Sequence, residues 1–123
     1  MNKEPTEAQA KEFWEWCGLK FKKQGIMGIN YYNTPNGGFV SEPPIDLNNL
    51  FEYAVPKLWN FGLLECIFHR EIAMFDDSGK FREQEKVYYR WHLLLESQIL
   101  NPIDGYGETP ALALFWAIWE VIK

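Results

Sequence analysis

Cysteine and histidine are scarce in this sequence. Its 123 residues include two cysteines and two histidines. There is no CxxC pair and no zinc-finger spacing, which argues against a disulfide-stapled scaffold and a structural zinc site. Cys17 and Cys66 stand singly in apolar surroundings, as buried thiols of a cytosolic protein do.

The sequence also lacks an excess of basic residues. Lys and Arg number 12 against 17 Asp and Glu, so the formal net charge is -5. Binding to DNA or RNA depends on positive charge that neutralises phosphates. We therefore expect no nucleic-acid partner. The acidic charge suits docking on a basic surface, although it is also ordinary for solubility.

The apolar run at residues 111–119 is too short to cross a bilayer. It has nine residues, and a membrane helix needs about 20. Residues 1–5 are polar and do not resemble a signal peptide. We expect a cytoplasmic protein that has no membrane association.

Aromatic residues, by contrast, are abundant. They make up 17% of the chain, and hydrophobic residues as a whole make up 47%. This is enough for the core of one domain, which we expect to span residues 1–123. It is also more aromatic surface than one small core usually hides. The surplus indicates a partner surface or a second copy of the chain.

The C-terminal segment predicts a helix that is apolar all round. Thr109 can cap it and Pro110 suits its first position. One sheet face covers only one stripe of such a helix. The second stripe, which includes Leu114, Ile118 and Val121, then meets the other helices or a second subunit. Because those helices need their own apolar faces for the sheet, we predict a two-fold homodimer through this stripe.

Earlier segments predict two helices and a hairpin. Thr6 and Gln9 fit a capping box, and Gly18 is a natural end for that helix. Residues 26–32 and 39–40 flank a dense turn signal and predict the hairpin. Residues 20–23 are predicted to be a solvated link. Asp46 caps the second helix, in which Pro56 either introduces a kink or starts a new turn.

From residue 64 the hydrophobic period changes to two. Residues 64–74 and 87–95 alternate apolar and polar side chains around a turn, so they predict a second, longer hairpin. Residues 101–107 are predicted to be a loop. The expected order is α-β-β-α-β-β-α, with the two hairpins in one antiparallel sheet covered by helices. This is an α+β fold.

His69 and His92 are the candidate metal ligands. Both have the outward parity of the second hairpin, and a turn centred near residues 80–81 places them opposite each other. Glu65 and Glu71 share this face, and two imidazoles with a carboxylate can bind a divalent metal. The alternative is a polar sheet face with cross-strand pairs and no metal. A register shift of one residue would be enough to separate the two histidines.

No catalytic group is predicted elsewhere. Cys66 has inward parity, away from both histidines, and an apolar surrounding disfavours its thiolate. Residues 76–80 lack the calcium-loop and phosphate-loop spacings and predict a turn. We therefore expect no enzyme activity, no cofactor and no bound metal.

Tyr31, Tyr32 and Phe39 flank the first hairpin turn. Exposed aromatics at such a tip are good anchors for a protein partner. The alternative is that alternate members pack beneath a helix. Both interpretations remain open, because faces cannot be assigned in so short a run.

Residues 13–18, 46–58 and 110–118 resemble segments of small proteins carried by phages and prophages. The layout is similar to the phage ABA-sandwich type of domain, in which an antiparallel sheet sits between helices. The resemblance implies an α+β sandwich of mobile-element origin and carries no catalytic residues. Our leading hypothesis is a non-enzymatic accessory protein in the host cytoplasm, acting through protein contacts. The alternative is a small metal- or ligand-binding enzyme that uses the His69/His92 face.

Overall fold

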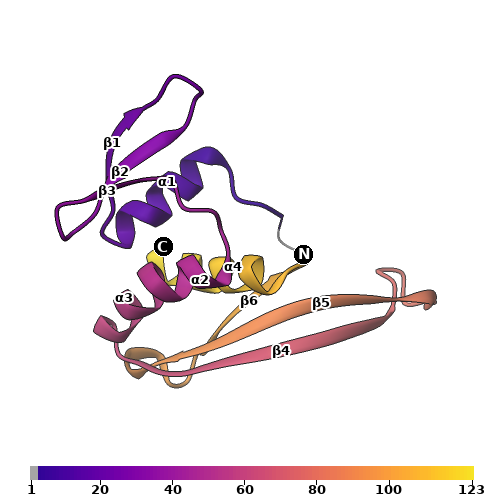
Figure 1. Cartoon of the computed structure of the whole chain (residues 1–123). Coiled ribbons are helices and arrows are strands. Elements are labelled where there is room, and N and C mark those ends of the chain that lie inside the picture. Colours follow the sequence, from indigo (N-terminus) through magenta and orange to yellow (C-terminus); the bar gives the residue numbers. More distant parts are fainter. Residues whose placement is uncertain (1–2) are drawn as a thin grey trace.

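The computed structural model describes the backbone of residues 3–123 and all of their side chains except those of 82–85. The chain forms two three-stranded antiparallel sheets, β1-β2-β3 and β4-β5-β6, with helices between them (Figure 1). The predicted α+β class is confirmed. In chain order the elements are α1 (Glu7–Trp16), β1 (Lys20–Gln24), β2 (Asn30–Asn33), β3 (Phe39–Ser41), α2 (Leu47–Asn49), η1 (Leu50–Ala54), α3 (Val55–Asn60), β4 (Leu63–Phe75), β5 (Phe81–Leu95), η2 (Glu96–Gln98), β6 (Ile103–Gly107) and α4 (Pro110–Ile122).

The first sheet contains one strand more than the predicted hairpin. β2 pairs with β3, as expected, but β1 pairs with the other edge of β2, where we predicted a solvated link. Every residue of β1 is exposed. Its Phe21 ring meets Tyr32 of β2 at 5.8 Å, while its lysines keep this edge charged and so disfavour pairing with another chain.

The second sheet is likewise a hairpin with an added strand. β4 pairs with β5 from Leu63 to Phe75, and β6 pairs with β5 over Tyr89–Leu93. We predicted a loop where β6 lies, because its glycines look like turn residues. In β6 those glycines face α4 and allow the helix to approach the strand closely.

The two hairpins belong to separate sheets rather than to the single sheet that we predicted. The second sheet packs on α4, α4 packs on α1, and α1 contacts the first sheet. The helices therefore form the middle layer and the two sheets form the outer layers (Figure 1). This layer order is the reverse of a sheet held between helices.

Helix α4 is the centre of the molecule, and its expected role as a dimer interface is wrong. Leu114 and Ile118 are fully buried within one chain, and Val121 packs against the core. We assumed that the apolar face of the first helix would pack on a sheet. Instead Phe13 of α1 packs on Phe115 of α4, with ring centroids 4.4 Å apart.

Pro56 lies inside a continuous helical segment that contains one wider turn. η1 is a π-helical stretch that ends where the Val55 N–H donates to the carbonyl of Leu50, and α3 then begins with Pro56 in its first turn. The wide turn accommodates a residue that has no N–H to donate. Of the two alternatives, the structure therefore shows the second, a new turn that begins at Pro56.

The three predicted helix caps are present. Thr6 and Gln9 form a capping box, and the Asp46 and Thr109 side chains accept from the backbone N–H of Asn49 and Leu112. Gly18, just beyond α1, has a positive φ of 103°, as a C-terminal cap requires. None of the helices described is long and apolar enough to span a membrane.

Candidate functional site

The hairpin of β4 and β5 extends well beyond the rest of the molecule (Figure 1). β6 pairs with β5 only as far as Tyr89, so the distal part of the hairpin is a two-stranded ribbon. We call this part, from Arg70 through the turn to Tyr88, the arm. A strand rises about 3.3 Å per residue and a helix only about 1.5 Å. Because α4 has 13 residues, as does β4, the helix is less than half as long as the strand.

Large apolar side chains are exposed along this ribbon. Phe68, at its base, and Ile72 are each 44% exposed, Met74 is 48% exposed, and Phe81, at the tip, is 67% exposed. We call these four residues the arm patch. From Glu65 to Ala73 the register keeps the alternation predicted for β4 and β5, with Phe68 opposite Trp91 and Ile72 opposite Val87. Phe81 lies beyond a register shift, opposite Phe75. What the alternation did not reveal is that none of the described helices covers the distal half of the ribbon (Figure 1).

Phe68 joins the arm patch to the core. Its ring stacks on Tyr89 at 5.7 Å and meets Trp91 at 5.1 Å. Trp91 is 8% exposed, and its indole N–H donates to the backbone carbonyl of Pro110 over 2.9 Å. The base of the patch is therefore held in a fixed orientation by the start of α4.

The opposite face of the second sheet carries a network of paired polar side chains. Arg90 Nε lies 2.6 Å from Glu71 Oε1 in a charge contact that lacks hydrogen-bond geometry, and Arg90 Nη1 lies 3.6 Å from Asp104 Oδ1. The Tyr88 hydroxyl donates to Glu71 over 2.7 Å. That hydrogen bond raises the pKa of Tyr88. The network joins β4, β5 and β6, and it explains the polar parity without any ligand.

The proposed pairing of His69 with His92 is wrong. His69 lies opposite Arg90, and His92 lies opposite Ile67, because the turn is centred away from residues 80–81. His92 Nδ1 is 2.9 Å from Asp104 Oδ1, so one ring nitrogen already has a carboxylate partner. Within residues 3–81 and 86–123, no group of three or more His, Cys, Asp or Glu side chains could hold a metal ion. The set of metal ligands on which the enzyme hypothesis depended is therefore not formed by His69 and His92.

Of the three aromatic residues of the first hairpin, one is buried and the other two lie on the opposite face. Tyr32 is fully buried, and its hydroxyl donates to Glu42 over 2.7 Å, so it cannot anchor a partner. Burial, the hydrogen bond to Glu42 and the nearby acidic residues raise its pKa. Tyr31 and Phe39 lie on the other face, with ring centroids 5.6 Å apart, and Phe39 is 55% exposed. These two remain candidates.

Both cysteines are free thiols. Burial raises the pKa of Cys17 to about 12 and that of Cys66 to about 11. Thiols with such pKa values stay protonated near neutral pH, as we expected for Cys66, and a protonated thiol is a poor nucleophile.

The arm patch is thus a row of large apolar side chains that the rest of the described chain leaves exposed. The sequence contained a signal for this exposed patch. A strand of a given number of residues is about twice as long as a helix with the same number, so the predicted helices are too short to cover the predicted hairpin. We expected Phe68, Ile72 and Met74 on the covered face, because alternation shows which side chains share a face and does not show how far that face is covered. Comparison with protein-family models, curated proteins and solved structures finds no match for this chain.

Proposed function

We propose that this protein is a non-enzymatic accessory protein of phage or prophage type that works through protein contacts. We propose further that its primary contact is with a second copy of itself, along the arm patch. The observation that carries the proposal is the row of apolar side chains on a two-stranded ribbon that projects beyond the helices.

The size of the arm patch supports an interface. If each of its four side chains has about 200 Å² of surface, their exposed fractions leave on the order of 400 Å² uncovered. The largest patch on a typical monomer is about 300–600 Å² and is often functional. Two copies, with the half-buried Val87 and Tyr89 on the same face, approach the lower end of specific interfaces, about 1,200 Å².

The shape of the arm favours a second copy as the occupant. An isolated two-stranded hairpin is marginally stable in water, and a covering layer stabilises it. A two-fold axis brings the same ribbon face of a second copy over the first, as in sheet-on-sheet packing. Arg70 shares this face, but it lies on the edge strand β4 and is exposed. Its guanidinium can therefore stay in water while its methylene groups pack.

The test is the mass in solution at tens of micromolar, measured by size-exclusion chromatography with light scattering. We expect twice the 14.5 kDa of one chain. The variant Ile72→Glu places a charge in the arm patch and should give a folded monomer with unchanged circular dichroism. Leu100→Glu is the matched control, since Leu100 is 92% exposed and lies outside the arm, and it should remain a dimer.

A wild-type monomer at this concentration would overturn the proposed self-association. A dimer that survives Ile72→Glu, or one that Leu100→Glu disrupts equally, would place the contact elsewhere and would also contradict it.

A further inference from the structure

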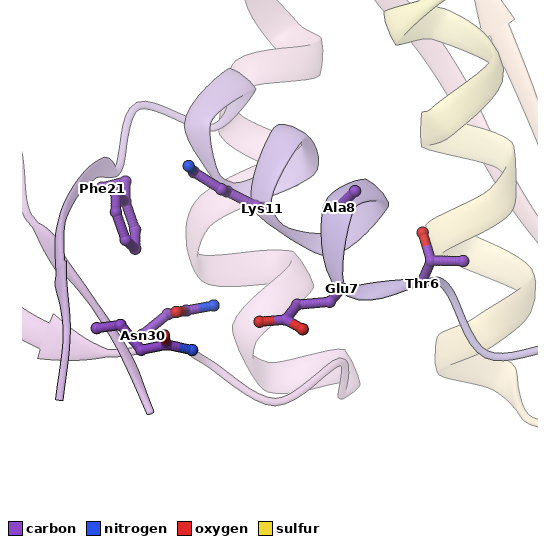
Figure 2. Close-up of a pocket in the computed structure, with 7 residues that line it drawn as sticks. Thr6, Glu7, Ala8, Lys11, Phe21 and Asn30 are labelled. Atoms are coloured by element: carbon purple, nitrogen blue, oxygen red, sulfur yellow. The ribbon is translucent and has the colours of Figure 1, made fainter. Parts of the chain in front are cut away.

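An open groove of about 530 Å³ lies between α1 and the first sheet, at the end of the molecule away from the arm. Figure 2 shows Glu7 reaching from the first turn of α1 toward Asn30 of β2, with Lys11 and Phe21 beside each other further along the groove. The volume is in the range of small-molecule sites, about 300–1,000 Å³. The side chains that line it are polar or aromatic, apart from Ala8.

Asn30 gives the groove a polar group that the protein itself does not use. It is only 8% exposed and is the one buried polar residue among those described. Its backbone carbonyl accepts from the Glu42 N–H over 2.7 Å, but its side-chain amide makes no hydrogen bond within the described part of the chain. Neither amide atom is among the side-chain atoms that are sealed off without a partner, and Asn30 lines the groove. The amide therefore opens onto the groove and is available to a ligand there.

Charge is the second feature of the groove. Glu7 forms no ion pair with any of the described side chains, although Lys11 stands one helical turn away. The Lys11 ammonium lies instead 4.1 Å from the centroid of the Phe21 ring. A neighbouring hollow of about 470 Å³ shares Thr6 and Glu7 with the groove and is also lined by Glu4 and Glu42. Three carboxylates thus line the two hollows against one lysine.

We propose that this groove binds an organic cation that carries a guanidinium group. The carboxylate of Glu7 accepts one of its N–H groups and the amide oxygen of Asn30 accepts another. A guanidinium suits this pair better than an ammonium does, because its planar fork presents several N–H donors in fixed directions. Phe21, which is 36% exposed, offers apolar surface for the attached methylene chain. The site is independent of the arm and of the self-association proposed above.

The direct test is calorimetric titration of the whole protein at low salt with agmatine, a small alkylguanidinium. We expect a Kd below about 1 mM, within reach of a ligand of this size. N-carbamoylputrescine has the same shape with a neutral urea head at the guanidinium end, and it should bind at least about tenfold more weakly if that charge matters. A blocked Ala-Arg-Ala tripeptide identifies the source. Tighter binding than agmatine indicates an arginine of a protein, and weaker binding indicates a free small molecule.

Two variants tie the binding to the groove. Glu7→Gln keeps the shape but removes the charge, and Asn30→Ala removes the amide, so each should weaken agmatine binding at least about tenfold. Glu12→Gln is the matched control, because Glu12 is exposed on the same helix and does not line the groove. It should change Kd less than about twofold. Should Asn30→Ala fail to fold, Glu7→Gln still decides. Absence of binding at about 10 mM agmatine, equal affinity for the urea analogue, or an equal loss in Glu12→Gln would overturn the proposal.

Discussion

A Cβ atom on Gly105 would lie 2.2 Å from the backbone nitrogen of Ala117. Strand β6 and helix α4 therefore touch backbone to backbone at this point. The contact holds the central helix on the second sheet, and only glycine fits the strand side of it. Gly107 makes a similar approach, with the nearest helix atom, Ala113 N, at 2.7 Å.

Gly105→Ala should lower the free energy of unfolding by about 2–3 kcal/mol, since overpacking forces the helix and strand apart. Urea denaturation followed by circular dichroism measures the change. Gly38→Ala is the control, because its new Cβ would approach only the tip of the Thr34 side chain, at 3.2 Å. A cost at Gly105 no larger than at Gly38 would show that α4 does not approach β6 this closely.

Asp46→Ala should cost about 1 kcal/mol of stability, because the helix loses its N-cap. The lost hydrogen bond joins Asp46 Oδ1 and the Asn49 N–H over 2.8 Å. Asn48→Ala, at an exposed position of the same turn, should leave the melting temperature unchanged or raise it slightly. Equal melting temperatures for wild type and Asp46→Ala would argue that the cap contributes nothing.

The two histidines should differ in their effect on stability. His92→Ala removes the contact with Asp104 and should cost about 1 kcal/mol. His69→Ala, which breaks no hydrogen bond or ion pair that the described residues make, should change stability by less than about 0.5 kcal/mol. Chemical denaturation near pH 7 measures both. Stoichiometric zinc, manganese or nickel in the purified protein, lost in both variants, would restore the metal hypothesis.

The thiols should make the protein less stable at alkaline pH. The native pKa values are about 12 for Cys17 and about 11 for Cys66, above the ordinary thiol value of about 8.5. Between these limits the unfolded chain binds fewer protons than the native protein. The free energy of unfolding therefore falls as pH rises from about 9.

The double variant Cys17→Ala/Cys66→Ala should show a shallower fall between about pH 9 and 11, measured by urea denaturation at several pH values. The slope against pH is the readout, so any constant cost of the substitutions does not matter. Identical slopes for variant and wild type would contradict the raised pKa values.

Local chemistry was predictable where a few adjacent residues decide it. The caps at Thr6, Asp46 and Thr109 depend on side chains that reach backbone groups three residues away. The inward and outward parity of β4 and β5 follows from strand geometry alone. The α+β class follows from the change of hydrophobic period near residue 64.

The sequence by itself thus determined the helix starts, the second hairpin and the two faces of its strands, because these features depend on neighbours in the chain. Only the tertiary structure decided that the hairpins form separate sheets, that Leu114 and Ile118 are core, and that His69 faces Arg90 instead of His92. Sheet partners and register depend on turns and long-range packing, and a small shift in the turn moves every cross-strand pair. The exposed arm depends on the difference in rise per residue between a strand and the helix that covers it, which is a property of the assembled layers.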